Sequence, residues 1–338
     1  MSNVKRLVAV LALSALVVGG LAGCLPGKQP VSAKFRVAVV FPGPINDAGW
    51  NESGYKGMLQ AKEKLGVETA YTENVPPAEF ESVIRDYADK KYDLLIAHGF
   101  EFTDAIKKVA PTALKTQFAI INGRDAQAPN VAAFRFNTPQ IGFLAGSFAG
   151  LMTKSNVVGM IGGMKYPHIV DSLNAFEVGA KYVNPNVKTL TAWVESWTDI
   201  PKGKELALAM IDQKADYLTA NANQVGLGCI EAAKQRGIKY VGYVGDQNAV
   251  APDTVVVSII QSVGNMMIHI IKNAQAKTIE PKLHLLGANE GVVFLSPYHN
   301  HENTVPASVK AKMTEIYAGI KDGSLLRAGV LPRSVFDK

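Results

Sequence analysis

The chain has 338 residues, of which 48% are hydrophobic and 19% are charged, and its formal net charge is +6. This composition is typical of a globular α/β protein, and the length favours two domains over a single compact core. The Lys and Arg residues are spread along the chain rather than gathered in a basic stripe, which argues against nucleic-acid binding.

The N-terminal residues have the pattern of an export signal. Lys5 and Arg6 precede an apolar run, residues 7–18, that is too short to span a bilayer comfortably. Leu-Ala-Gly then leads directly to Cys24, which resembles a bacterial lipobox. We therefore predict a signal peptide over residues 1–23 and a lipidated tether over residues 24–34. The mature protein would be extracytoplasmic and anchored to the cell membrane through Cys24. An uncleaved anchor helix with an incidental cysteine is the alternative.

The next stretch predicts a buried strand followed by a polar loop and a helix. Residues 37–41 form a continuous apolar run, which is typical of a strand covered on both faces. Pro42-Gly43-Pro44 can continue neither strand nor helix. Asn46 and Asp47 offer N-cap chemistry, and residues 52–65 read as a helix. The strand therefore delivers polar and aromatic side chains to its carboxyl end, where open α/β sheets bind ligands.

Strand and helix patterns then alternate to the end of the chain. Further strands are predicted at 69–71, 93–97, 117–121, 131–136, 157–161, 188–194, 217–220, 240–244, 255–260 and 291–295. Helices are predicted at 78–90, 103–109, 141–152, 169–182, 202–213, 226–236, 263–274 and 308–322. Two successive βαβα runs predict two doubly wound parallel-sheet lobes.

We expect the strand at 255–260 to return to the first lobe, so that several chain crossings form a hinge. The N-terminal lobe would then comprise residues 35–137 and 255–298, and the C-terminal lobe residues 138–254 and 299–338.

The residues that follow the predicted strands are polar and aromatic. The first lobe supplies Asp47, Trp50, Asn51, Phe100 and Asn122, and the second supplies Trp197, Asn223 and Asp246. Flat rings with amides and carboxylates suit a planar, uncharged heterocycle, because rings stack on its faces while polar groups bind its edge. The alternative is structural: Trp50 would cap the core, Trp197 would pack on its own lobe, and Asp246 would cap the next helix.

Catalytic signatures are weak. The sequence has no Gly-x-Ser-x-Gly elbow and no Walker loop, and residues 159–164 lack dinucleotide-binding spacing. His299-Asn-His301 with Glu302 resembles at most a surface metal cluster. Cys229 follows glycines at the start of a predicted helix, which favours an inert buried thiol. We predict no enzyme activity, no metal and no cofactor.

Seven short motifs occur in an order that resembles the basic membrane protein family of ABC-transporter substrate-binding lipoproteins, whose best-understood members are purine nucleoside receptors. They are Asp47-Ala-Gly-Trp-Asn51, Pro129-Asn-Val131, Gly142-Phe-Leu-Ala-Gly146, Val158-Gly-Met-Ile-Gly-Gly163, Val183-Asn-Pro-Asn186, Ser196-Trp-Thr-Asp199 and Gly245-Asp-Gln247. The resemblance runs from about residue 35 to about residue 325 and implies a type I periplasmic-binding-protein-like fold.

The resemblance also implies roles for single residues. Trp50 and Trp197 match positions of aromatic rings, Asp47 and Asn51 match a loop that helps to read the base, and Asp246 matches an Asp that grips ribose hydroxyls.

Three positions depart from the nucleoside-binding pattern. Gln261 stands where those receptors resemble one another in a Lys, Asn122 where Asp is common, and Gln140 where Glu is common. The resemblance therefore implies a purine base similar to adenine, or a purine nucleoside, that two closing lobes deliver to an ABC permease. A receptor for a sugar or another small heterocycle, a sensor or adhesion lipoprotein, and an exported nucleosidase are the alternatives.

Overall fold

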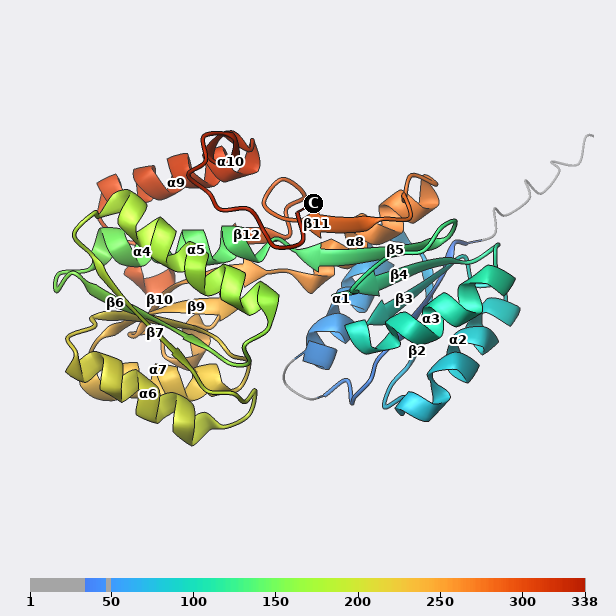
Figure 1. Cartoon of the computed structure of the whole chain (residues 1–338), viewed down its shortest axis with the longest axis horizontal. Coiled ribbons are helices and arrows are strands. Elements are labelled where there is room, and N and C mark those ends of the chain that lie inside the picture. Colours follow the sequence, from blue (N-terminus) through green and yellow to red (C-terminus); the bar gives the residue numbers. More distant parts are fainter. Residues whose placement is uncertain (1–33, 47–49, 338) are drawn as a thin grey trace, which may run out of the picture. The chain divides into compact units, whose positions relative to one another are not determined.

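The computed structural model describes residues 34–46 and 50–337 (Figure 1). The predicted signal peptide, Cys24 and Asp47 lie outside the described residues. Residues from Lys34 onward form one compact unit, which contains two six-stranded sheets. Within the described part of the chain, no helix is both long enough and apolar enough to cross a membrane.

The first sheet has the strand order β11-β5-β4-β3-β1-β2, and each neighbouring pair is parallel. Its strands are β1 (Arg36–Val40), β2 (Glu68–Thr72), β3 (Leu94–His98), β4 (Gln117–Ile121), β5 (Val131–Phe136) and β11 (Leu283–Leu286). The apolar runs that predicted β1, β3, β4 and β5 are buried along almost their whole length. The sequence pattern therefore identified the central strands correctly.

Helices cover both faces of this sheet, and β1 shows why. Val37 and Val39 belong to one hydrophobic core, whereas Ala38 and Val40 belong to another. The first core includes residues of α1 (Trp50–Leu65) and α8 (Val263–Gln275). The second includes residues of α2 (Phe80–Asp89) and α3 (Thr103–Val109). Because side chains alternate along a strand, a run that is apolar at every position needs a layer on each face.

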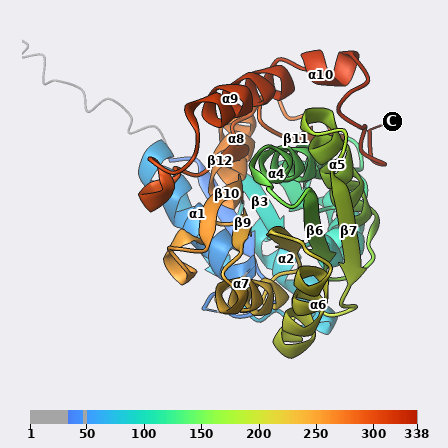
Figure 2. The ribbon, with the colours of Figure 1, turned by 90° about the vertical axis from the view of Figure 1, so that its left-hand side faces the viewer.

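The second sheet has the order β12-β10-β9-β8-β6-β7, and β12 runs antiparallel to β10. Its strands are β6 (Val157–Gly162), β7 (Lys188–Trp193), β8 (Tyr217–Asn221), β9 (Lys239–Val244), β10 (Val255–Gln261) and β12 (Val293–Leu295). Helices α4 (Thr138–Met152), α5 (Pro167–Val183) and α9 (Ala307–Lys321) lie on one face, and α6 (Ile200–Asp212) and α7 (Val225–Arg236) lie on the other (Figure 2). The short helix α10 (Ser324–Arg327) follows α9.

Helices α4 and α5 pack at very short range. A Cβ atom built on Gly142 would lie 2.0 Å from the carbonyl oxygen of Ser172, and one on Gly146 would lie 2.0 Å from that of Phe176. Glycine is required at both positions because the two backbones leave no room for a side chain. The many Gly and Ala residues of this part of α4 are typical of a helix that packs so closely against its neighbour.

The strand at 255–260 was assigned to the wrong sheet. It is β10, which pairs with β9 and β12 of the second sheet rather than returning to the first lobe. The first lobe instead receives α8, which packs against α1 where Gly57 meets Gly264, and the unpredicted strand β11, which pairs with β5. An apolar run shows that a strand is buried but does not specify its sheet. The described chain passes between the lobes after β5, after β10 and after β11, so the predicted multiple crossings are present.

The C-terminal segment contacts elements of both lobes. The hydroxyl of Ser334 and the backbone N–H of Val335 each donate to Asp171 Oδ2 on α5, at 2.9 Å. Two residues from Ser334, the ring of Phe336 lies 4.1 Å from the guanidinium carbon of Arg135, which belongs to β5 of the first sheet. The buried Asp171 carboxylate therefore holds this segment on the second lobe, while Phe336 reaches the first.

Candidate ligand-binding site

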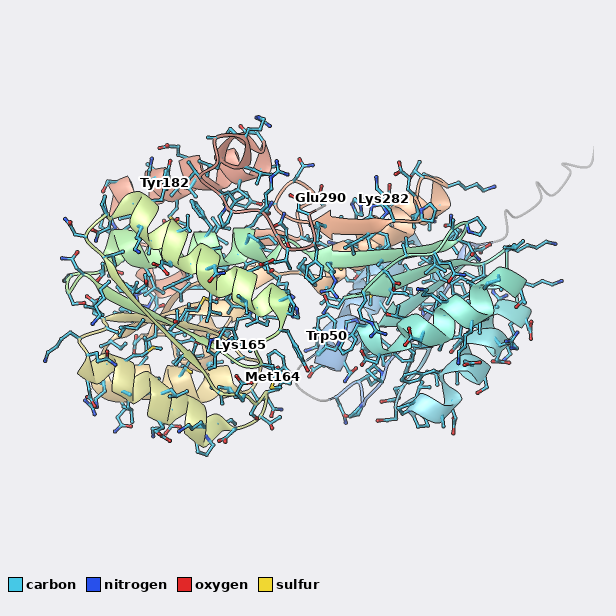
Figure 3. All side chains as sticks on the ribbon, in the orientation of Figure 1. Trp50, Met164, Lys165, Tyr182, Lys282 and Glu290 are labelled. Carbon is cyan, nitrogen blue, oxygen red and sulfur yellow. The ribbon has the colours of Figure 1, made fainter. Side chains whose placement is uncertain are left out.

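In the first lobe, Trp50 is held against the end of β3. Its indole N–H donates to the carbonyl oxygen of His98 at 3.3 Å, and His98 Nε2 donates to the carbonyl oxygen of Trp50 at 2.8 Å. The two rings are stacked, with 4.1 Å between centroids and 16° between planes. Figure 3 labels Trp50 at the start of α1. One face of the indole therefore meets His98, which leaves at most one face to offer a ligand.

The other described candidates of this lobe also follow strand ends. Asn51 is buried, and a Cβ on Gly43 would approach its side-chain nitrogen to 2.7 Å, so the loop after β1 lies directly over this amide. Phe100 is 47% exposed. Asn122 follows β4 with φ of 59° and donates its backbone N–H to Phe134 at 2.8 Å. Because β1, β3 and β4 are parallel, these residues lie at one edge of the first sheet.

Sequence reasoning missed Glu101, which follows the end of β3. Burial raises the pKa of its carboxyl group above the ordinary value. Its side chain occupies the space beside Gly99, where a Cβ would lie 2.4 Å from Glu101 Oε2. This half-buried acid lies at the same sheet edge as the other first-lobe candidates, but no spacing in the sequence marks it.

In the second lobe, Trp197 lies on the loop after β7. A Cβ on Gly163 would lie 2.6 Å from its ring, so the glycine that follows β6 provides the space for the indole. The ring of Tyr166 lies 6.2 Å away at 38°. Figure 3 labels Met164 and Lys165 on the same loop between Gly163 and Tyr166. Trp197 is therefore half-buried against the β6–α5 loop, with part of its surface exposed.

A buried polar network braces the ends of β8 and β9. The hydroxyl groups of Tyr243 and Ser172 are 2.5 Å apart, and the side-chain amide of Asn221 donates to Tyr243 at 3.3 Å. Burial raises the pKa of Tyr243, so the phenol stays neutral and able to donate. Asn223, which follows β8, is exposed and has φ of 48°.

Asp246 and Gln247 follow β9 and are tied to their own lobe. Asp246 Oδ2 accepts from His299 Nε2 at 2.7 Å, and Oδ1 accepts from the backbone N–H of Asn248 at 3.2 Å. Gln247 accepts from the backbone N–H of Tyr243 at 3.0 Å through its side-chain oxygen. Side-chain hydrogen bonds therefore brace the turn after β9, and the bond from His299 is a feature that the sequence did not reveal.

Gln261 lies at the end of β10, opposite Val293 of β12, and is half-buried. The second-lobe candidates thus lie at or after the carboxyl ends of β7, β8, β9 and β10, at one edge of their sheet. The structure also has a shallow pocket of about 380 Å³ elsewhere, lined by residues of β11 together with His269, Glu290 and Phe336. None of the predicted ligand-binding residues lines that pocket.

Two doubly wound lobes, with polar and aromatic residues at the carboxyl ends of their parallel strands, define the type I periplasmic-binding-protein-like class. Among solved structures with this fold, an ABC transporter solute-binding protein from Conexibacter woesei is 22% identical, with a TM-score of 0.71 over 86% of this chain and 97% of that one.

The family described as ABC transporter substrate-binding protein, PnrA-like, matches residues 34–321, and the chain belongs to this family. A purine-binding protein of Brucella abortus is 31% identical over 92% of this chain and 88% of its own length. Basic membrane protein A of Borreliella burgdorferi is 30% identical over 76% of this chain and 78% of its own. The resemblance seen in the seven motifs is confirmed.

Two further relatives are named as transcriptional activators. The transcriptional activator protein med of Bacillus subtilis is 31% identical over 87% of this chain and 90% of its own length. The crystal structure of a transcriptional activator of the comK gene from Bacillus halodurans is 25% identical, with a TM-score of 0.77 over 85% of this chain and 98% of that one.

Proposed function

We propose that this protein is the substrate-binding component of an ABC importer and that it binds a purine base, similar to adenine, or a purine nucleoside. The observation that carries the proposal is the half-buried Trp197 on the loop after β7, in a chain whose family includes a purine-binding relative. An aromatic ring at a strand end offers a stacking surface for a planar base, and the amides and carboxylates beside it can pair with the edge of the base.

Binding would act through closure of the two lobes. A ligand that contacts Trp50, Asn51, Phe100 and Asn122 on one lobe, and Trp197, Asn223, Asp246 and Gln261 on the other, gains its full set of contacts only in the closed form. It therefore shifts the population toward closure. The closed form would dock on a membrane permease. Lipidation at Cys24 would keep the receptor on the extracytoplasmic surface, with multiple acyl chains needed for stable anchoring.

A thermal-shift screen tests the ligand class. The purified protein is unfolded and refolded to remove carried-over ligand, and it is then mixed with purine bases, nucleosides, pyrimidines and sugars. A ligand present at about 100 times its dissociation constant should stabilise the fold by about 2.7 kcal/mol. A shift with sugars but with no purine would overturn the proposal.

Two tryptophan variants test the site. Stacking of a base on an aromatic ring contributes about 1–3 kcal/mol, so Trp197→Ala should weaken purine binding by about 5- to 150-fold. The matched control is Trp193→Ala, because Trp193 lies within β7, where its ring packs against Gly162. Equal loss of affinity in both variants would mean that the Trp197 ring is not a ligand contact.

Sensing is a second candidate, favoured by the two relatives named as transcriptional activators. A sensor would close on its ligand in the same way but would not support uptake. Measuring uptake of labelled purine in cells with and without the protein separates the two functions.

A further inference from the structure

The segment His299–His301, a short 3₁₀ turn that follows β12, docks on the connection between β9 and β10. His299 Nε2 donates to Asp246, and His301 Nε2 donates to the carbonyl oxygen of Pro252 at 2.8 Å. Between them, the Asn300 side chain donates to Asp253 at 3.3 Å and accepts from Asn248 at 3.4 Å. Three consecutive side chains thus fasten one segment to one loop, and we call residues 299–301 the clasp.

The clasp does not have the arrangement of a metal site. Its two imidazoles bond to different partners, one to a carboxylate and the other to a backbone carbonyl. Among the residues that the structure describes, no group of three or more His, Cys, Asp or Glu side chains is placed to hold a metal ion. The His-Asn-His motif therefore acts in the structure through hydrogen bonds to the β9–β10 connection.

The contact between His299 and Asp246 differs from the other three contacts of the clasp because of where Asp246 lies. The carboxylate follows β9, at the sheet edge where the candidate ligand contacts gather, and its side chain is 37% exposed. The clasp's other partners are Asn248, the Pro252 carbonyl and Asp253, and none of them is a candidate ligand contact. Of the three clasp residues, His299 is therefore the one that reaches a candidate ligand contact.

We infer that His299 is a positioning residue, which holds the Asp246 carboxylate in one orientation before ligand arrives; this inference rests on the proposed function. An exposed Asp samples several rotamers, and fixing one of them costs free energy that binding would otherwise have to supply. In the free protein, His299 donates to Oδ2 at 2.7 Å and the backbone N–H of Asn248 donates to Oδ1. These bonds fix the carboxylate before the ligand binds, so binding need not supply that free energy. Oδ1 also accepts from the Ser258 hydroxyl at 3.5 Å, so its two lone-pair sites are used. Oδ2 accepts only from His299 among the described residues and can still accept from a ligand N–H or hydroxyl group.

A double-mutant cycle tests this role. His299→Leu, Asp246→Asn and the double variant are compared with the wild type by calorimetric titration with the best purine of the screen. His299→Leu should weaken binding by about 5- to 30-fold, and the double variant should bind no more weakly than Asp246→Asn alone, because His299 acts through Asp246. A purely structural role for His299 predicts losses that add.

Two further variants complete the design. His299→Gln keeps an N–H donor near Asp246 and should restore most of the affinity. His284→Leu is the matched control, because it removes a 2.8 Å bond from an imidazole to the Glu280 carbonyl oxygen in the other lobe. This control should leave binding unchanged.

The outcomes separate the two proposals. If the wild type binds a purine and His299→Leu binds it equally well, the positioning role is overturned and the proposed function stands. Additive losses in the cycle, or no recovery in His299→Gln, also overturn the positioning role. If the refolded wild type binds no purine at all, the proposed function fails and this inference fails with it.

Discussion

Two glycines in helix α7 should respond in opposite ways to the same substitution. A Cβ on Gly228 would lie 2.2 Å from the carbonyl oxygen of Ile200 and 3.0 Å from the backbone nitrogen of Lys204, both on the neighbouring helix α6. A Cβ on Gly226, in the same helix, would meet nothing nearer than the Tyr240 hydroxyl at 3.7 Å. Alanine therefore fits at one position and collides with backbone at the other.

The magnitudes follow from these contacts. Relief of the collision at Gly228 requires α6 and α7 to separate by about 1 Å, and overpacking of this kind costs about 1–3 kcal/mol. Gly226→Ala should leave stability unchanged or raise it by up to about 1 kcal/mol, since alanine favours the helix. For about 300 residues that unfold together, each kcal/mol shifts Tm by roughly 1–2 °C. Urea unfolding followed by circular dichroism measures both variants. A Gly228→Ala protein as stable as Gly226→Ala would refute the argument.

Three further predictions concern groups away from the candidate site. Burial raises the pKa of Cys229 to about 12, so the thiol should resist a thiol-reactive reagent at pH 8 in the folded protein and react fully in urea; rapid native labelling would contradict this. Burial and the nearby Arg135 lower the pKa of His168 from 6.5 to about 4. Because the unfolded chain then binds the extra proton, stability should fall by about 1–3 kcal/mol between pH 6.5 and pH 4, and His168→Gln should flatten that dependence in urea titrations at several pH values. Phe336→Ala should lower stability by about 0.5–2 kcal/mol through loss of the contact with Arg135, and no change in the urea midpoint would refute it.

The sequence predicted those parts of the fold that depend on local pattern. Residues 37–40 of β1 and residues 118–121 of β4 are all apolar and all buried, as expected for strands covered on both faces. Strand β11 escaped prediction because its four residues include His284 and are only partly buried. Strand β10 was recognised but assigned to the wrong sheet, because its pairing with β9 and β12 is a long-range contact that no local period encodes.

For the candidate site too, local features could be predicted from the sequence but long-range contacts could not. Residues that follow strands could be identified from the strand pattern, and the structure places the described ones at the expected sheet edges. The partners of those residues could not be identified. Trp50 stacks on His98, and Asp246 bonds to His299, although each partner is distant in sequence. Such pairs form because distant segments of the chain meet at a sheet edge. The local sequence pattern does not show which segments meet there.

The pairing of β5 with β11 also bears on how the chain folds as it is synthesised. Leu283 of β11 pairs with Ala133 of β5, so the ribosome adds about 150 residues after β5 before its neighbour exists. During that time the backbone of β5 presents an unpaired edge, of the kind that templates aggregation. The second sheet is also incomplete until β12 has been synthesised, and β12 begins only at Val293. Both sheets are therefore completed within a few residues of each other, late in translation, and holdase chaperones would have their longest opportunity to bind the nascent chain before that point.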